Sequence, residues 1–178
     1  MAYSKTLVLV FLTLSQFFHQ HPHLAKADSK LILNVCRATD VPDICIQCLQ
    51  SDPYAEFASA VELAFIMMNC ISSHADALQV NMEDTASNSK NKSTKSVYNA
   101  CVKAYMAAKK DLKSAIDHLQ SYEIDEAESY VGQAMLKHQS CYYAIENNKE
   151  LTIPSEVAYE MKIYEELCFS TERIIERF

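Results

Sequence analysis

The sequence predicts an all-α protein, an up-down-up-down four-helix bundle preceded by a short disulfide-linked helical hairpin at the N-terminus. Apolar residues recur at steps of three and four over four long stretches, which places them on one face of a helix. Alternating apolar and polar runs, the mark of half-buried strands, do not occur. The chain has a single glycine, Gly132, and is rich in helix formers.

The scarcity of glycine also limits the classes of function. Phosphate-binding loops, dinucleotide-binding folds and strained nucleophile turns all need glycine where the backbone turns tightly or approaches a ligand. Cys45-Ile46-Gln47-Cys48 is the one C-x-x-C pair, and no second pair completes a zinc site. We therefore expect no cofactor and no bound metal.

Two amphipathic helices are predicted back to back between Val97 and Ile145, separated by the polar break Gln120–Glu123. The apolar stripe of the first helix is Val97, Cys101, Ala104, Ala108, Leu112, Ala115 and Leu119. The stripe of the second is Ile124, Ala127, Val131, Ala134, His138, Cys141 and Ile145. If the turn is centred near residue 121, Cys101 and Cys141 lie level on facing stripes, within reach of a disulfide.

Residues 1–27 have the three parts of a secretory signal peptide. Lys5 gives a positive start, Thr6–Phe18 is an apolar run too short to span a bilayer, and Ala25-Lys26-Ala27 is a cleavage site. We therefore expect a mature chain of residues 28–178, secreted outside the cell and not bound to a membrane after cleavage.

The mature chain is acidic and contains enough residues for one domain with a substantial core. Cleavage removes Lys5 and Lys26, which leaves 14 basic against 23 acidic residues and a net charge of −9. This charge disfavours nucleic acid and anionic membranes as partners and suits a basic protein surface. Seven cysteines in a secreted chain favour disulfides.

Residues 28–52 predict the N-terminal hairpin. A short apolar stripe ends at Cys36, and a second short helix over Asp43–Leu49 carries Cys45 and Cys48. Helices of this length are marginal alone, so a disulfide is expected to join them. The spacing fits Cys36–Cys45 and Cys36–Cys48 equally.

Residues 53–178 predict the bundle. Asp52-Pro53 resembles a helix start, a capping residue followed by proline. The stripe that follows is Phe57, Val61, Ala64, Met68, Ile71, Ala75, Leu78 and Met82. Residues 86–95 predict a mobile polar loop that holds a glycosylation sequon at Asn91. The last helix starts near Pro154, and its stripe is Val157, Met161, Tyr164, Cys168, Thr171 and Ile175.

The order of the four helices makes the first and the last neighbours. Counting levels from the three turns places Cys70 level with Cys168, so a third disulfide between them is predicted. Cys48 would then be the unpaired thiol.

The cysteine pattern resembles that of the plant invertase and pectin methylesterase inhibitor family. The residues that carry the resemblance are C-x8-C-x2-C-L from Cys36, then C-x3-Y-x2-A-x3-L-x2-A from Cys101, and A-x3-V-x2-A-x6-C from Ala127 to Cys141. The resemblance covers the mature chain. It implies a helical hairpin on a four-helix bundle, with bridges Cys36–Cys45 and Cys101–Cys141.

The same resemblance implies that the protein is expected to block the active-site cleft of a plant cell-wall enzyme by forming a 1:1 complex in the apoplast. The family's invertase inhibitors share a Pro-Lys-Phe tripeptide at the turn between the second and third bundle helices. That place here holds Ile124-Asp125-Glu126. Pectin methylesterase inhibitors often have an aromatic residue there, three before an alanine, and Ile124 takes that place before Ala127. We therefore favour pectin methylesterase slightly over acid invertase.

Acidic side chains gather near this turn and are candidates for partner binding. Such a patch would steer a basic enzyme surface, although an ordinary solvated face has the same composition. The candidates, together with the apolar residue at the turn, are Asp111, Asp117, Glu123, Ile124, Asp125, Glu126 and Glu128.

Three other functions compete with inhibition. An enzyme is disfavoured, because His74, His118 and His138 fall at different levels and no nucleophile has a base nearby. A carrier of a small apolar ligand would need a cavity lined by small residues such as Ala64, Ala104, Ala108, Ala127 and Ala134. A divergent family member with a different protein partner is the third alternative.

Overall fold

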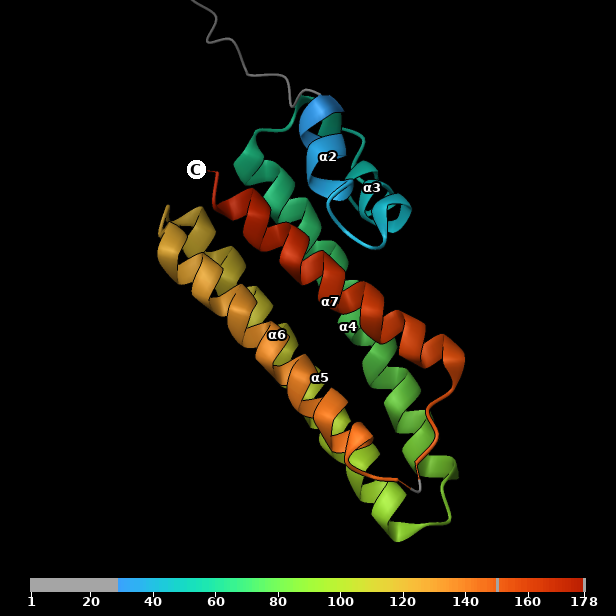
Figure 1. Ribbon diagram of the computed structural model, residues 1–178. Coiled ribbons are helices and arrows are strands. Elements are labelled where there is room, and N and C mark those ends of the chain that lie inside the picture. The colour runs from blue at the N-terminus through green and yellow to red at the C-terminus, as the bar shows by residue number, and fades with distance from the viewer. Residues whose placement is uncertain (1–28, 150, 178) are drawn as a thin grey trace, which may run out of the picture.

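The computed structural model describes residues 29–149 and 151–177, so the predicted signal peptide lies outside the described residues. Within those ranges the chain forms six α-helices and one short 3₁₀ helix, with no strand (Figure 1). The prediction of an all-α fold is therefore confirmed.

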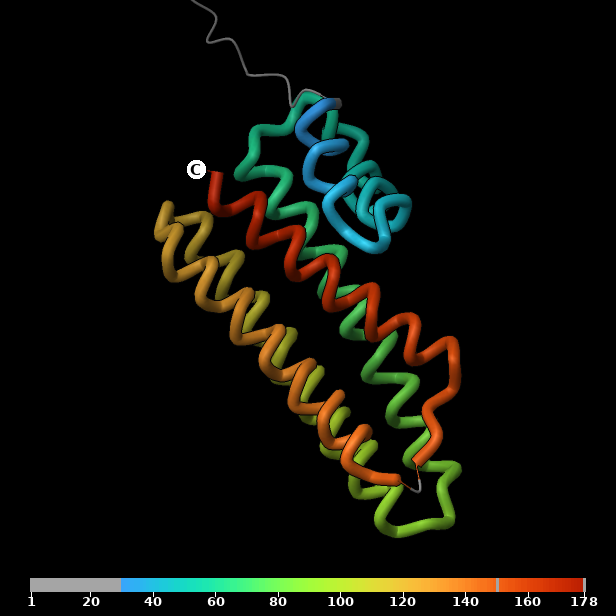
Figure 2. Tube along the Cα trace, in the orientation of Figure 1, coloured from blue at the N-terminus to red at the C-terminus, as the bar shows by residue number. Residues whose placement is uncertain are grey.

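Four long helices form the bundle: α4 (Ala60–Asn88), α5 (Lys92–Gln120), α6 (Ile124–Glu146) and α7 (Ser155–Ile175). They run alternately up and down, as the tube in Figure 2 shows. Each packs on two of the others, α4 on α5 and α7, and α6 on α5 and α7. The first and last bundle helices are thus neighbours, which is the predicted topology.

The core follows the predicted stripes closely. All the stripe residues of α6 except Ile124 are buried, and so are all those of α7. Tyr98 and Tyr105 are also fully buried, although the narrow stripe predicted for α5 omitted them. The two tyrosines flank that stripe, so the buried face of α5 is wider than the apolar spacing alone indicates.

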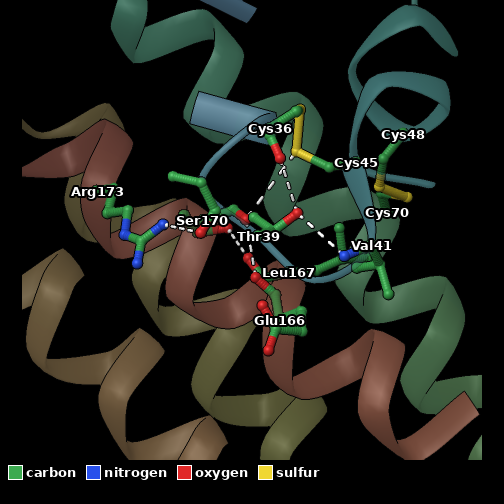
Figure 3. Close-up of a disulfide and its surroundings, with 12 residues drawn as sticks. Cys36, Thr39, Val41, Cys45, Cys48, Cys70, Glu166, Leu167, Ser170 and Arg173 are labelled. Carbon is green, nitrogen blue, oxygen red and sulfur yellow. Dashed lines mark hydrogen bonds between the residues drawn. A yellow bond between two sulfur atoms is a disulfide. The ribbon is translucent and has the colours of Figure 1, made fainter. Parts of the chain in front are cut away.

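The N-terminal hairpin consists of α2 (Ser29–Cys36) and α3 (Pro42–Gln50), and it packs against α4 and α7. Its connecting turn is held by α7. Arg173 donates a hydrogen bond of 2.8 Å from its guanidinium to the carbonyl of Ala38, and Glu166 accepts one of 3.1 Å from the amide of Asp40. Thr39 closes the turn from within by donating to the carbonyl of Cys36 (Figure 3).

Two predicted boundaries are wrong. The first bundle helix begins at Ala60 instead of Pro53, because Asp52 accepts a hydrogen bond from the amide of Tyr54 and caps a tight turn. A 3₁₀ turn, η1 (Ala55–Phe57), follows, and the helix starts at a capping box in which Ser59 and Glu62 each accept from the other's amide. Phe57 consequently lies outside the helix and is exposed.

The polar loop predicted over residues 86–95 is also much shorter, since α4 extends to Asn88 and α5 begins at Lys92. Asn91 caps α5, because its side-chain oxygen accepts hydrogen bonds from the amides of Ser93 and Thr94. The polar residues after Asn91 therefore form the first turn of α5, because the cap satisfies its free amides and the exposed turn has no need of apolar side chains.

Three disulfides link the described cysteines. Cys36 is bonded to Cys45 and Cys101 to Cys141, with Cα atoms 5.3 and 4.7 Å apart, the pairs that the family resemblance implied. The predicted bridge between Cys70 and Cys168 is wrong. Cys70 is bonded instead to Cys48 of α3, and Cys168 is a free thiol in the core. The reason is that the hairpin packs beside α4 and brings Cys48 next to Cys70. Counting levels along the four bundle helices did not include the hairpin.

Candidate functional site

The turn between α5 and α6 is held in one conformation by a Schellman motif. The amide of Glu123 donates to the carbonyl of His118 at 3.0 Å, and the amide of Tyr122 donates to that of Leu119 at 3.1 Å. The motif requires a left-handed residue at Tyr122, where φ is 60°. Glycine is the usual residue there, so a tyrosine stores about 1–3 kcal/mol of backbone strain.

The ring of Tyr122 is 82% exposed at this end of the bundle, the most exposed of the large hydrophobic residues described. Strained residues cluster at functional sites, and tyrosine is enriched among the residues that dominate binding interfaces. Tyr122 is absent from the contact residues predicted from the sequence. An aromatic residue within an otherwise polar turn was the signal that would have identified it.

The predicted acidic residues fall into two groups in space. Asp117, Glu123, Asp125 and Glu126 are exposed around the turn, with Ile124 and Glu128 half-buried beside them. We call these six residues together with Tyr122 the turn surface. Its negative charge and exposed ring are suited to contact with a basic protein surface.

Asp111 does not belong to this group. It lies farther along α5, is half-buried, and has one carboxylate oxygen with no hydrogen-bond partner among the described residues. Burial raises the pKa of Asp111, and the positive charge of Lys137 partly opposes this. Asp111 therefore lies outside the turn surface, and its assignment as a partner contact stays a prediction.

Part of the turn surface is engaged in internal contacts. His118 Nδ1 lies 2.5 Å from a carboxylate oxygen of Glu123, and its ring stacks on Tyr130 with centroids 5.1 Å apart. These contacts link the end of α5 to the start of α6. The exposed side chains of the turn are therefore presented from a rigid base, which reduces the entropy lost when a partner binds.

His138 is buried inside the bundle, where it packs against two tyrosines. Its Nδ1 is 2.9 Å from the hydroxyl of Tyr105, and its ring stacks on Tyr164. Burial lowers the pKa of His138 to about 4, so the ring is neutral at mildly acidic pH. Among the described residues, His74 contacts Glu160, His118 contacts Glu123 and His138 contacts Tyr105.

A groove of about 520 Å³ lies between α6 and α7. Its lining combines apolar side chains, such as Ile145 and Met161, with the charged groups of Lys162, Glu165 and Glu166. The alanines expected to line an interior cavity for a carried ligand are instead part of the packed core. The groove is open to the surface. Separately, no helix among the described residues is long and apolar enough to cross a membrane.

The sequon residue Asn91 is exposed and caps the start of α5, which lies at the opposite end of the bundle from the α5–α6 turn (Figure 1). Its side-chain oxygen is engaged in the α5 cap.

Comparison with known proteins matches the chain to a family model and to solved structures. A family model described as plant invertase/pectin methylesterase inhibitor matches residues 30–171. No curated protein sequence matches the chain.

Two solved structures share the fold. A crystal structure of a pectin methylesterase inhibitor from Arabidopsis thaliana is 21% identical, with a TM-score of 0.63 over 84% of this chain and 96% of that chain. Mutant form A of a pectin methylesterase inhibitor from Arabidopsis is also 21% identical, with a TM-score of 0.66 over 81% and 93%. At this identity the likeness concerns the fold alone.

Proposed function

Since the chain belongs to the plant invertase/pectin methylesterase inhibitor family, we propose that it is a secreted inhibitor of a cell-wall enzyme. It forms a 1:1 complex that covers the active-site cleft, and pectin methylesterase is favoured over acid invertase. In this proposal residues 1–27 are removed on export to the apoplast, and Asn91 carries a glycan away from the binding end.

The observation that carries the proposal is Tyr122, an exposed aromatic ring held in a left-handed conformation at the tip of an acidic turn. The chain tolerates strain here without any gain in packing, which indicates selection for something other than stability. The preference for pectin methylesterase rests on the residues after the ring, where Ile124-Asp125-Glu126 stands in place of the Pro-Lys-Phe of invertase inhibitors.

The test replaces Tyr122 by glycine in the oxidised mature chain and measures inhibition of purified plant pectin methylesterase and acid invertase. Glycine relieves the backbone strain and removes the ring, so stability is unchanged or higher while inhibition weakens by about 10-fold or more. Equal inhibition by both forms would remove Tyr122 from the interface.

A second pair of variants tests the charges of the turn surface. The double substitution D125N/E126Q removes two exposed charges at the turn, and E83Q/D84N removes two exposed charges near the far end of α4. We expect the first to slow association with a basic enzyme surface and the second to leave it unchanged. Equal effects of the two variants would show that net charge alone matters.

A further inference from the structure

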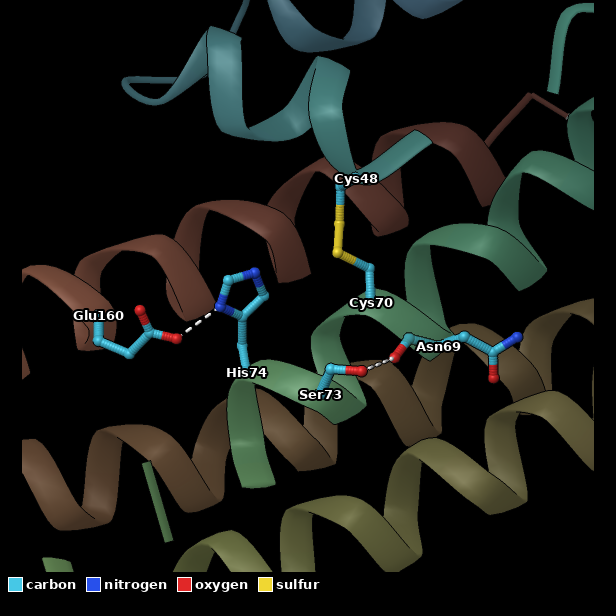
Figure 4. A network of polar contacts seen from close by, with 6 residues as sticks. All are labelled: Cys48, Asn69, Cys70, Ser73, His74 and Glu160. Carbon is cyan, nitrogen blue, oxygen red and sulfur yellow. Dashed lines mark hydrogen bonds and ion pairs between the residues drawn. A yellow bond between two sulfur atoms is a disulfide. The ribbon is translucent and has the colours of Figure 1, made fainter. Parts of the chain in front are cut away.

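Cys48, Cys70 and His74 form a cluster of metal-ligating side chains far from the turn surface. Cys48 comes from α3, whereas Cys70 and His74 stand one turn apart on α4. One ligand atom from each residue lies within 4.8 Å of the other two. Figure 4 shows the disulfide and the imidazole together between the hairpin and the bundle.

The distances suit a tetrahedral zinc ion once the two sulfurs are reduced. Zn–S bonds of about 2.3 Å and Zn–N bonds of about 2.1 Å place neighbouring ligand atoms roughly 3.5–3.8 Å apart. The sulfurs therefore have to separate by less than 2 Å relative to a disulfide of about 2.0 Å. The Cα atoms of Cys48 and Cys70 are already 5.8 Å apart.

Glu160 orients the histidine for such a role. Its carboxylate lies 2.5 Å from Nδ1 of His74, and both side chains are largely shielded from solvent. A carboxylate on one ring nitrogen fixes the tautomer and leaves Nε2 as the ligand, which is the usual outer arrangement of zinc-binding histidines. Because Glu160 belongs to α7, the cluster and its support involve three different helices.

The Cys48–Cys70 bridge is also the one most open to a reductant among the three described. Cys70 is half-buried, whereas the four cysteines of the other two bridges are at most 2% exposed. Thiol–disulfide exchange requires a thiolate to reach a sulfur atom, so access favours attack at this bridge.

We propose that reduction of the Cys48–Cys70 disulfide creates a zinc site formed by Cys48, Cys70 and His74, with Glu160 as its outer support. A dithiol reductant gives two electrons and two protons to the bridge and becomes a disulfide itself. The two protein thiols then release two protons as their sulfurs bind Zn²⁺, and a water molecule fills the fourth position. The metal replaces the disulfide as the link between α3 and α4.

The test measures zinc stoichiometry on the full mature chain before and after treatment with graded amounts of a dithiol. We expect no zinc on the oxidised chain and one ion per reduced chain. Co²⁺ in place of Zn²⁺ should give the visible absorption of a tetrahedral site with thiolate ligands. Mass spectrometry after alkylation identifies the bridges that opened, and circular dichroism checks that the helices remain.

Single substitutions separate this site from weak surface binding. His74→Ala should abolish stoichiometric binding, and Glu160→Gln should weaken it by about 10–100-fold. His118→Ala is the matched control, because His118 is also paired with a glutamate at 2.5 Å but is not part of this cysteine cluster, and it should leave binding unchanged.

Three results would overturn the proposal. The first is the absence of stoichiometric zinc on the reduced chain. The second is equal binding by the oxidised chain or by the double variant C48S/C70S. The third is that another bridge opens before Cys48–Cys70.

Discussion

In both the bundle and the N-terminal hairpin a disulfide joins two neighbouring helices. The two pairs of helices differ greatly in length and in the packing between them. Cys101–Cys141 joins α5 and α6, helices of 29 and 23 residues with a continuous buried seam. Cys36–Cys45 joins α2 and α3, helices of 8 and 9 residues. We therefore expect the first bridge to add stability to a structure that its core already specifies. We expect the second to be needed to keep its helices formed, because helices this short are marginal alone.

The largest expected effect is on global stability when the bundle bridge is removed. The cysteines of this bridge are separated by 40 residues, and the chain-entropy model gives about 4 kcal/mol for a loop of that size. We expect C101A/C141A to lose about this much unfolding free energy in denaturant titration while keeping its helical circular dichroism. Loss of the bundle helices at low denaturant would contradict the claim that the core specifies them.

Acidification is expected to affect the bundle next. The pKa of His138 is about 4 in the folded state and about 6.5 when unfolded, so the unfolded chain binds more protons between these values. The neutral His138 therefore contributes up to about 3 kcal/mol to the free energy of unfolding. This contribution is fully present above pH 6.5 and is lost as the pH falls through 6.5 towards 4.

The substitution His138→Gln tests this by flattening the dependence of unfolding free energy on pH in that range. His118→Gln, at a half-buried position near the α5–α6 turn, serves as the comparison and should retain the slope contributed by His138. An unchanged slope in the first variant would assign the acid sensitivity of the bundle to other groups.

Removal of the hairpin bridge should have a smaller but more local effect. Its cysteines are separated by 9 residues, for which the same model gives about 2.5 kcal/mol. In C36A/C45A we expect the amides of α2 and α3 to lose protection from hydrogen exchange while those of α5 and α6 keep it. Uniform loss of protection across both regions would contradict the claim that only the hairpin helices depend on this bridge.

The smallest expected effect concerns the junction between the two regions. Ser59 caps α4, and its backbone and side-chain hydrogen bonds lower the pKa of Glu62. Ser59→Ala should cost about 1 kcal/mol of unfolding free energy. Ser73→Ala, which removes a hydroxyl bonded to the carbonyl of Asn69 within α4, should change it little. Similar losses in both would mean that the capping box does not define where the bundle begins.

Apolar periodicity predicted the bundle because a repeat of 3.6 residues indicates which face of each helix is buried. The pairing of Cys101 with Cys141 was predictable from the sequence for a related reason, since two helices joined by a short turn have a fixed register. The pairing of Cys48 with Cys70 was not, because it depends on how a separate hairpin docks on α4, and no repeat in the sequence encodes that docking.

The candidate site was predicted only in part. The charges around Asp125 and Glu126 could be located once the turn was located, because residues next to a turn share one end of a bundle. The burial of Asp111 and the strain at Tyr122 depend on side-chain packing and on a φ angle, neither of which is visible in composition or spacing.

The measurement that tests the central claim most directly is a titration of pectin methylesterase with the oxidised mature chain, with acid invertase titrated in parallel. Under the proposed inhibition, esterase activity falls linearly and reaches its minimum at one chain per enzyme molecule, while invertase activity is less affected. Full activity of both enzymes in the presence of a folded, oxidised chain would contradict it and would assign the protein a different partner.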